Sequence, residues 1–481
     1  MGRTPTDTVP SMSHDLPPLV DSHCHLTWES FADDHDDVIA RMREQGVEQA
    51  IVVATSVENA RACAALCRDR EGLYPTVGIH PSDVPAEDLD AALADFDEEL
   101  HRGGYVAIGE TGLDYYWDES RIPQQQQSFR HHCRRAVEND LPVVVHIRDK
   151  DGSWTAFDDV GDIIEEHPGL RGVIHCYTGD PAHADRYRAA GFVISFSGIL
   201  TFPKGDNVRE SALSVPIEET LVETDAPFLA PVPRRGKRNE PSYVAYTAKA
   251  LAELKGLSEA DVRRITTRNA RRVFRLPTEE TAGPPTYVIR NSLYVNVTNA
   301  CDAKCTFCPR THDEFEVKGY DLRRAKDPTV EEILEAIGDP TVYDEVVFCG
   351  FGEPTLRLET VKQVAAWAKE RGVRTRLNTN GHADLIHKRS TAGDLVGLID
   401  VVSVSLNAQD RETFERHCPS AFSPDGFTPM LDWIRSARDA GLQVVCTAVK
   451  GLEGVDMEAC RRLAEEELGV TWRGRTLDEV G

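Results

Sequence analysis

Short apolar runs recur about every 25 to 35 residues along this chain, and helix-like segments of mixed polarity separate them. This rhythm predicts strands that alternate with helices, and therefore an α/β protein with parallel sheets. Eight such runs occupy the first part of the chain, at residues 16–23, 49–56, 73–80, 105–110, 141–147, 172–177, 191–198 and 220–227. Eight βα units in about 260 residues predict a (β/α)8 TIM barrel, whose active site lies at the carboxyl ends of its strands.

Six further runs follow, at residues 292–298, 344–353, 373–381, 400–407, 442–451 and 469–475. They predict a second, partial (β/α)6 barrel. A polar stretch rich in proline and glycine, residues 277–285, has the composition of a linker. We therefore expect a disordered segment at 1–18, a first barrel at 19–276, the linker at 277–285 and a second barrel at 286–481.

The charge balance restricts the partners of the chain. Its 481 residues carry a formal net charge of −26, which disfavours non-specific adhesion to nucleic acid or to an anionic membrane. A nucleic acid must therefore bind at a local basic patch. No apolar run is long enough to span a membrane, and the polar amino terminus lacks the apolar region of a leader peptide. We expect a cytoplasmic protein without membrane contact, and its oligomeric state stays open.

Residue types that bind metals or phosphate cluster at the predicted strand ends of the first barrel. His23 and His25 are two residues apart in extended chain, so both imidazoles can reach one ion. Such a pair alone is more often structural, but five further residues occupy equivalent places: His80, Glu110, His146, His175 and Asp225. Imidazole and carboxylate ligands suit Zn, Mn or Mg, and a carboxylate such as Glu110 can bridge two ions. The pattern predicts a two-metal hydrolase.

The motifs DSHCH (21–25), GIHP (78–81), GETGLDYY (109–116), HIRD (146–149), IHCYTG (174–179) and the segment from Glu223 to Pro241 resemble, in order, the TatD family of metal-dependent deoxyribonucleases. The resemblance covers about residues 19–276. It implies that His23, His25 and Asp225 hold one ion, that His146 and His175 hold the other, and that Glu110 bridges them. Glu110 and Asp225 would then be catalytic, and His80 and Asp114 would line the site. Such enzymes cleave DNA with Mg or Mn, and some members are credited with deacylation of aminoacyl-tRNA.

Two surface features near these residues suit a nucleic-acid substrate. Positive charge follows Asp225 in the loop that contains Arg234, Arg235, Lys237 and Arg238, and these side chains are our candidates for holding phosphate. A solvated loop without a ligand is the alternative. Tyr115, Tyr116 and Trp117 are placed to stack on a base, although aromatic packing at the barrel rim explains them equally well.

Three cysteines in the second barrel have the spacing CxxxCxxC, directly after the run SLYVNVT (292–298): Cys301, Cys305 and Cys308. Three thiolates can bind three irons of a four-iron cluster and leave the fourth iron open to a small molecule. Zinc is the alternative, but structural zinc needs four ligands, and no fourth cysteine or histidine lies at finger spacing. Cys349, Cys418, Cys446 and Cys460 are isolated in sequence, and we interpret them as ordinary buried thiols.

This motif resembles the radical S-adenosylmethionine superfamily over about residues 286–481. The resemblance implies one 4Fe-4S cluster, S-adenosylmethionine, and a one-electron reductant that starts cleavage of the sulfonium. The segment GFGEPTL (350–356) is similar to the glycine-rich motif that receives the methionine amino group, with Phe351 in place of the commoner glycine. The expected contacts to S-adenosylmethionine are Gly350, Gly352, Glu353, Ser405 and Asn407.

The whole chain thus resembles TatD-associated radical proteins, in which a nuclease and a radical domain are fused. No motif identifies the radical substrate, and the insert at 310–328 is where we expect substrate or partner contacts. Two alternatives stay open. The first barrel can be an aminoacyl-tRNA deacylase or another amidohydrolase on the same metals. The second can be a module that modifies nucleic acid, or an Fe-S or zinc module without catalysis.

Overall fold

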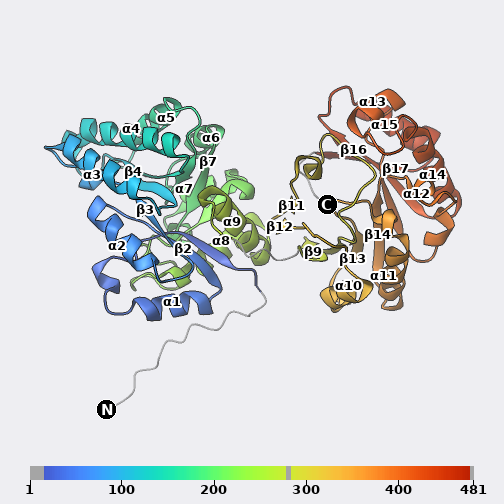
Figure 1. Ribbon diagram of the computed structural model, residues 1–481, viewed down its shortest axis with the longest axis horizontal. Coiled ribbons are helices and arrows are strands. Elements are labelled where there is room, and N and C mark those ends of the chain that lie inside the picture. Colours follow the sequence, from blue (N-terminus) through green and yellow to red (C-terminus); the bar gives the residue numbers. More distant parts are fainter. Residues whose placement is uncertain (1–15, 278–282, 477–481) are drawn as a thin grey trace, which may run out of the picture. The chain divides into compact units, whose positions relative to one another are not determined.

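The computed structural model describes residues 16–277 and 283–476 (Figure 1). The chain divides into two compact units, Met1–Glu279 and Glu280–Gly481. Most of the predicted disordered segment, residues 1–15, lies outside the described residues, and so does the greater part of the predicted linker, residues 278–282. Each unit is described by itself below.

The first unit is built on one parallel sheet. Within the described residues this sheet has eight strands in the order of the sequence. They are β1 (Leu19–Cys24), β2 (Val47–Val52), β3 (Leu73–Val77), β4 (Ala107–Asp114), β5 (Val143–Arg148), β6 (Gly172–Ile174), β7 (Phe192–Phe196) and β8 (Thr220–Val222). Each strand falls on one of the predicted runs, and the predicted TIM-like barrel is confirmed.

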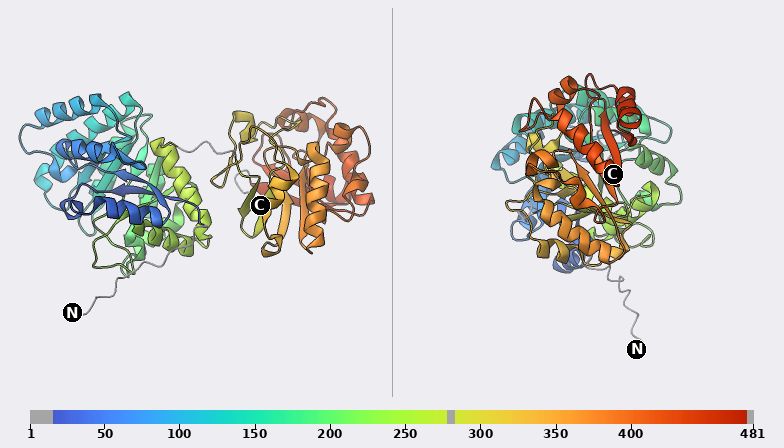
Figure 2. Two further views of the ribbon diagram at one scale, coloured as in Figure 1. Left: turned by 60° about the horizontal axis from the view of Figure 1, so that its bottom comes forward. Right: turned by 90° about the vertical axis from the view of Figure 1, so that its right-hand side faces the viewer.

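Helices cover the outer face of these strands (Figures 1 and 2). They are α1 (His35–Glu44), α2 (Val57–Cys67), α3 (Leu89–Arg102), α4 (Ile122–Asn139), α5 (Thr155–Glu165), α6 (Pro181–Ala189), α7 (Asp206–Ser214), α8 (Val244–Lys255) and α9 (Glu259–Phe274). Several begin at a side chain that satisfies the free N–H groups of the first turn. Ser56 accepts from Asn59 before α2, and Ser258 accepts from Asp261 before α9.

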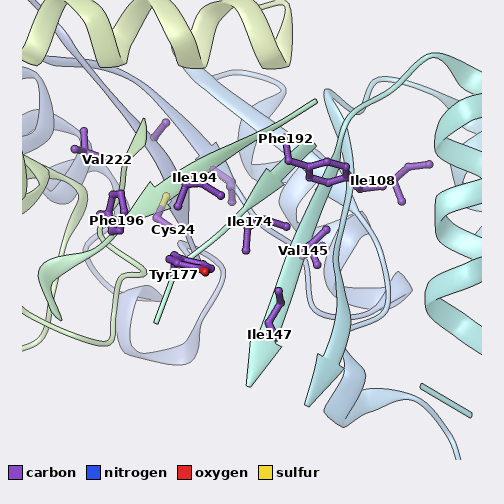
Figure 3. Close-up of a cluster of buried hydrophobic side chains, with 14 of the residues drawn as sticks. Cys24, Ile108, Val145, Ile147, Ile174, Tyr177, Phe192, Ile194, Phe196 and Val222 are labelled. Atoms are coloured by element: carbon purple, nitrogen blue, oxygen red, sulfur yellow. The ribbon is translucent and has the colours of Figure 1, made fainter. Parts of the chain in front are cut away.

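Alternation along each strand separates two apolar cores. In β5, Val143, Val145 and Ile147 face the helices and pack with Ile174, Phe192 and Ile194, as Figure 3 shows for most of them. Val144 faces the barrel interior with Val173 of β6. His146 and His175 each follow one of these interior valines by two residues. The pleat therefore points both imidazoles toward the carboxyl end of the barrel interior.

Strand β8 returns to β1 at that same end. The N–H of His25 donates to the carbonyl of Ala226 at 2.7 Å, and the N–H of Asp225 donates to the carbonyl of His23 at 2.9 Å. The buried carboxylate of Asp21 accepts from the hydroxyl of Thr224 at 2.6 Å. Burial raises the pKa of Asp21 to about 8, although its bonds to Thr224 oppose that rise. These contacts bring residues from opposite ends of the unit's sequence into one site.

The second unit has a seven-stranded sheet within the described residues, in the order β17-β16-β15-β14-β13-β10-β9. Its strands are β9 (Thr286–Ile289), β10 (Ser292–Val295), β13 (Glu345–Phe348), β14 (Arg374–Thr379), β15 (Val401–Ser405), β16 (Gln443–Lys450) and β17 (Thr471–Thr476). The six predicted strands are present and pair in parallel. Strand β9 was not predicted. It pairs antiparallel with β10 through a tight turn at Arg290 and Asn291, and its four residues are too short a run to stand out beside the linker.

Helices cover this sheet as well: α10 (Val330–Ile337), α11 (Leu358–Glu370), α12 (Ala383–His387), α13 (Arg411–His417), α14 (Phe427–Asp439) and α15 (Met457–Arg462). The insert at 310–328 contains a small hairpin of β11 (Glu316–Val317) and β12 (Tyr320–Asp321). In neither described range is a helix both long and apolar enough to cross a membrane.

Candidate active sites

Glu110 of β4 is the centre of the first site. Its side chain is buried, and its two carboxylate oxygens face different groups of ligands. Oε2 lies 3.4 Å from Nε2 of His23 and 3.6 Å from Nε2 of His25. The same two imidazoles lie 3.7 and 3.4 Å from Oδ1 of Asp225. The end of β1 and the loop after β8 thus form one half of the site.

The other carboxylate oxygen of Glu110 faces the second half. Its Oε1 lies 2.9 Å from Nδ1 of His146 and 2.8 Å from Nε2 of His175. The structure therefore brings together all six residues that the resemblance to TatD enzymes proposes as ligands. His175 also stacks on His23 with 3.9 Å between the ring centroids, and these two imidazoles can form a ligand group with Asp225, so the division into two ligand sets stays a prediction.

The donor atoms fit two cations. Nε2 of His23 and Nε2 of His25 are 3.2 Å apart, and Nδ1 of His146 is 3.3 Å from Nε2 of His175. His25 directs its Nδ1 at the carbonyl of Val53, 3.0 Å away, so its Nε2 has a free lone pair when the ring is neutral. Facing lone pairs need a cation or a proton between them, and one such pair lies beside each oxygen of Glu110.

The charge state of Glu110 suits this role. Burial by itself raises the pKa of a carboxyl group, but the neighbouring imidazoles, above all that of His175, outweigh that effect. They hold the pKa of Glu110 well below its usual range. The bridging position is therefore occupied by a carboxylate, which is the form that binds metal.

Two carboxylates lie behind the ligands. Oδ2 of Asp114 is 3.3 Å from Nε2 of His146, and Oε1 of Glu223 is 3.4 Å from Nδ1 of His175. Glu223 also accepts from the N–H of Cys176 at 2.6 Å. Such partners fix the orientation of metal-binding imidazoles. Sequence reasoning gave Asp114 no definite role and missed Glu223, which is inconspicuous beside the ligand Asp225.

We expect Glu223→Gln to weaken divalent metal binding on the His175 side by about 10- to 100-fold, because the substitution removes the charge that orients this imidazole. Equilibrium dialysis against manganese measures the affinity. Glu219→Gln, a change at a half-exposed carboxylate just before β8, is the matched control. Equal affinities for the two variants would contradict the role given to Glu223.

His80 lies at the site in a different state. The N–H of Ser82 donates to Nδ1 of His80 at 3.1 Å, so the hydrogen of the neutral ring is on Nε2. That nitrogen is 3.6 Å from Oε1 of Glu110. Burial lowers the pKa of His80 to about 3, which keeps the ring neutral. In this tautomer His80 is a hydrogen-bond donor at the site, although it also belongs to a group with Glu110 and His146 whose donor atoms lie within 4.8 Å of one another.

Exposed aromatic rings lie beside the candidate metal ligands. Trp28 and Phe228 are 42% and 44% exposed, their rings are 5.2 Å apart, and both contact the ring of His25. Tyr116 and Trp117 lie beneath the guanidinium of Arg148, which is 4.1 and 5.1 Å from their ring centres. Sequence reasoning missed the first pair, because isolated aromatic residues far apart in sequence give no pattern.

The stacking role considered for Tyr115 is wrong. Its ring is buried in the core, and its hydroxyl donates to Asp159 at 2.7 Å. Alternation explains the difference, since successive residues at the end of β4 point to opposite sides. Only Tyr116 and Trp117 of the predicted aromatic trio are accessible to a ligand.

The four basic residues of the loop after β8 differ in their surroundings. Arg238 makes two hydrogen bonds to the carboxylate of Asp34, at 2.9 and 2.6 Å, and covers the ring of Phe31. This ion pair occupies its guanidinium and corrects the expectation that Arg238 holds phosphate. Arg234 lies over Tyr243, Arg235 lies over Phe202, and Lys237 is exposed. Arg235 and Lys237 are the more accessible phosphate candidates.

The three cysteines of the second unit lie on one loop after β10. Cys301, Cys305 and Cys308 are each partly exposed. The N–H of Cys308 donates to the carbonyl of Cys305 at 3.1 Å, and the N–H of Ala303 donates to the sulfur of Cys301 at 3.4 Å.

The loop after β13 packs directly on this cysteine loop. The N–H of Glu353 donates to the carbonyl of Ala300 at 2.9 Å. A side chain at Gly350 would meet Asn296 at 2.0 Å, and one at Gly352 would meet the carbonyl of Thr298 at 2.2 Å. The side chain of Asn296 and the backbone of Thr298 therefore leave no room for a side chain at either position, and the expected contacts of Gly350 and Gly352 with S-adenosylmethionine stay a prediction.

Glu353 is also bonded internally. Its Oε1 accepts from the N–H and hydroxyl of Thr355 and from the hydroxyl of Thr379, at 2.6 to 2.9 Å. Its Oε2 accepts from the N–H of Asn380 at 2.8 Å. The carboxylate thus connects the carboxyl ends of β13 and β14. Because Oε2 accepts one hydrogen bond, it can accept a further hydrogen bond from a ligand.

The remaining predicted contacts lie at the end of β15. Ser405 is partly exposed there, and Asn407 is buried in a left-handed conformation with φ of 56°. Nδ2 of Asn407 contacts the sulfur of Cys418 at 3.6 Å, while its Oδ1 is buried without a hydrogen-bond partner. A buried acceptor without a donor is costly, so this oxygen is a candidate ligand contact.

A buried network that the sequence did not indicate holds the cysteine loop in place. Asp302, between the first two cysteines, is 2.7 Å from Nδ1 of His382 and accepts from Nδ2 of Asn380 at 2.7 Å. The loop is thereby fixed to the carboxyl end of β14. The cysteines, the Glu353 loop and the β14 end thus form one connected site.

Comparison with known proteins assigns both units to families. The family model described as TatD related DNase matches residues 20–275, which is more than half of the chain. The chain belongs to the TatD family. A second model, the radical SAM superfamily, matches residues 295–466. The protein therefore joins a TatD-like metal-dependent hydrolase domain, which implies divalent metals, to a radical SAM domain, which implies an iron-sulfur cluster and S-adenosylmethionine.

Relatives of known sequence match the TatD domain. The uncharacterized metal-dependent hydrolase YcfH of Escherichia coli is 39% identical over 267 residues, which cover 54% of this chain and 96% of that protein. The uncharacterized metal-dependent hydrolase YabD of Bacillus subtilis is 37% identical over 260 residues, 54% of this chain and 99% of that protein. The crystal structure of the TatD homolog YjjV from Escherichia coli superposes with a TM-score of 0.50 at 28% identity, over 54% of this chain and 98% of YjjV.

Proposed function

We propose that the first domain is a deoxyribonuclease that hydrolyses phosphodiester bonds with two divalent ions, Mg, Mn or Zn. One observation carries the proposal: each carboxylate oxygen of Glu110 lies beside its own pair of facing imidazoles. His23, His25 and Asp225 would hold one ion, His146 and His175 would hold the other, and Glu110 would bridge them. When bound, such ions activate water and polarise the scissile bond.

The protein groups around the metals have separate tasks in this proposal. Asp114 and Glu223 keep the imidazoles of His146 and His175 in orientation. The Nε2–H of His80 points into the site and would donate to an oxygen of the substrate. Because the pKa of this imidazole is about 3, its donor capacity is the same throughout the neutral pH range.

The surroundings of the metals favour a nucleic acid with accessible bases. The ring pair of Trp28 and Phe228 next to His25 offers a stacking surface, and Arg235 and Lys237 add local positive charge to a strongly acidic protein. Stacking on aromatic side chains needs unpaired bases. We therefore propose single-stranded DNA or a frayed end as the substrate. A deacylase acting on aminoacyl-tRNA is the alternative, since it would use the same metals and the same stacking surface.

We expect Trp28→Ala and Phe228→Ala each to raise the KM for a single-stranded oligonucleotide by roughly 5- to 150-fold, because a stacked base contributes about 1 to 3 kcal/mol. The metal content should not change. Leu213→Ala, which removes an exposed apolar side chain on α7, is the control. Hydrolysis of aminoacyl-tRNA without cleavage of DNA would decide for the alternative function.

We infer that the second domain binds one 4Fe-4S cluster on Cys301, Cys305 and Cys308, and binds S-adenosylmethionine beside Glu353, Ser405 and Asn407. Together these groups supply a 5′-deoxyadenosyl radical when an external one-electron donor reduces the cluster. The protein contributes a fixed cysteine loop and the buried acceptor of Asn407. All twelve cysteines are free thiols, which suits a reducing compartment such as the cytoplasm.

Anaerobic reconstitution tests this inference. The protein should take up about four irons with equal sulfide, and dithionite with S-adenosylmethionine should yield methionine and 5′-deoxyadenosine. Uptake of zinc instead of iron would indicate a structural zinc module. Iron without 5′-deoxyadenosine would show an Fe-S module without this catalysis.

A further inference from the structure

Cys418 is far from the cluster motif in sequence but lies beside it in the structure. The cysteine loop (residues 301–308) runs antiparallel to residues 417–421. Three backbone hydrogen bonds join the two segments: the N–H of Lys304 to the carbonyl of Pro419 at 2.7 Å, that of Thr306 to His417 at 2.8 Å, and that of Ala421 to Asp302 at 2.8 Å. This pairing corrects our interpretation of Cys418 as an isolated buried thiol.

The register of this pairing sets Cys305 directly opposite Cys418. In an antiparallel pairing, residue pairs that exchange hydrogen bonds alternate with residue pairs that do not. Ala303 and Ser420 form a pair of the second kind. Cys305 and Cys418 form the next such pair. Residues in such pairs have Cα atoms about 4.5 Å apart, and disulfides form at Cα separations of about 4.4 to 6.8 Å. A pair in this register thus falls within the range of Cα separations that admits a disulfide.

The side chains agree with the backbone. Cys418 is the strongest influence on Cys305, whose pKa this neighbouring thiol and burial raise above its usual range. The amide of Asn407 contacts the sulfur of Cys418 at 3.6 Å and holds it in place. Cys418 is 3% exposed, whereas Cys305 is partly exposed. An oxidant therefore reaches Cys305 first, and Cys418 is the nearest thiol that can respond.

We propose that Cys305 and Cys418 form a reversible disulfide when the cluster is absent and a peroxide is present, and that Cys418 acts as a resolving thiol for this cluster ligand. Hydrogen peroxide transfers one oxygen atom to the Cys305 sulfur, which becomes a sulfenic acid, and its other oxygen leaves as water. Because the raised pKa of Cys305 leaves little thiolate, this step is slow and needs an excess of peroxide. The Cys418 sulfur then attacks the Cys305 sulfur, the S–O bond breaks, and a second water leaves. Two thiols are oxidised as one peroxide is reduced, so the step balances.

Two consequences follow for the cluster site. A disulfide sulfur is not a thiolate, so the bond removes one of the three cluster ligands and blocks cluster assembly. It also protects Cys305 from further oxidation to a sulfinic acid, which thiols do not reverse. A reducing environment restores both thiols. A protein that has lost its cluster and formed this disulfide can therefore be reduced and can then assemble a cluster again. This inference rests on the proposed cluster site, but formation of the disulfide does not require radical chemistry.

The test uses the full-length protein, stripped of iron by a chelator under reducing anaerobic conditions and then exposed to hydrogen peroxide. Trypsin places Cys305 in the peptide 305–310 and Cys418 in the peptide 417–435, while Cys301 lies in 291–304. We expect mass spectrometry to find the first two peptides linked, about 2 Da below their summed mass, with fragmentation placing the bond on Cys305 rather than Cys308. Iron uptake should fall at least about 10-fold and return after reduction.

Two variants complete the experiment. Cys418→Ala should take up iron normally before peroxide, but after peroxide its iron uptake should not recover on reduction. Cys446→Ala is the control, because Cys446 is a buried thiol opposite Val404 and Trp472, and it should behave as the wild type. A free Cys418 after peroxide, or a bond between Cys301 and Cys308, would overturn the proposal. Loss of 5′-deoxyadenosine with the disulfide intact would count only against the proposed radical function.

Discussion

Replacing Glu110 with glutamine should reduce hydrolysis by about 10³-fold or more and release both divalent ions. The amide keeps the size of the side chain but has no negative charge, and its nitrogen cannot bind a cation. Since Oε2 faces His23 and His25 while Oε1 faces His146 and His175, the change affects both halves of the site. A loss of about 4 kcal/mol of transition-state stabilisation corresponds to this rate.

The measurement is the turnover of single-stranded DNA with manganese, together with the metal content after dialysis. Glu138→Gln alters a partly exposed carboxylate on α4 that pairs with Arg135, and it should leave both quantities unchanged. Circular dichroism confirms that the barrel is folded. Full activity of Glu110→Gln would show that Glu110 does not bridge two ions.

Simultaneous replacement of Cys301, Cys305 and Cys308 by alanine should remove all cluster iron and the brown colour. It should also lower the yield of 5′-deoxyadenosine at least about 100-fold. The three thiols are the cluster ligands that the loop after β10 offers. The TatD domain has its own core and its own site, so its hydrolytic activity should be retained. If the triple variant retained iron, or lost nuclease activity, the assignment of the cluster to the second domain and of hydrolysis to the first would be contradicted.

The fold was predictable where the sequence had clear periodicity. The strands β1 to β8 lie on the predicted apolar runs, and His146 and His175 follow interior valines by two residues, so the period of a strand sufficed to place them. Strand β9 escaped notice because Thr286–Ile289 is short and borders the linker. Its place depends on pairing with β10 rather than on its own composition.

The parts of the sites that depend on tertiary contacts were less accessible. Arg238 has the sequence context of a phosphate ligand, but Asp34 from a distant segment pairs with it. The side chain of Asn296 and the carbonyl of Thr298 leave no room for a Cβ at Gly350 and Gly352, a requirement that the glycine-rich motif alone did not reveal. Cys418 lies opposite Cys305 only because two loops pair in one register, which no local pattern encodes.

Elemental analysis of the anaerobically reconstituted full-length protein tests most directly the claim that one chain holds two independent metal centres. The wild type should contain about four irons and about two further divalent ions per chain. Glu110→Gln should keep the irons and lose both divalent ions, and the triple cysteine variant should do the opposite. A protein that keeps either divalent ion without the Glu110 carboxylate, or that binds zinc instead of iron at its three cysteines, would contradict the account.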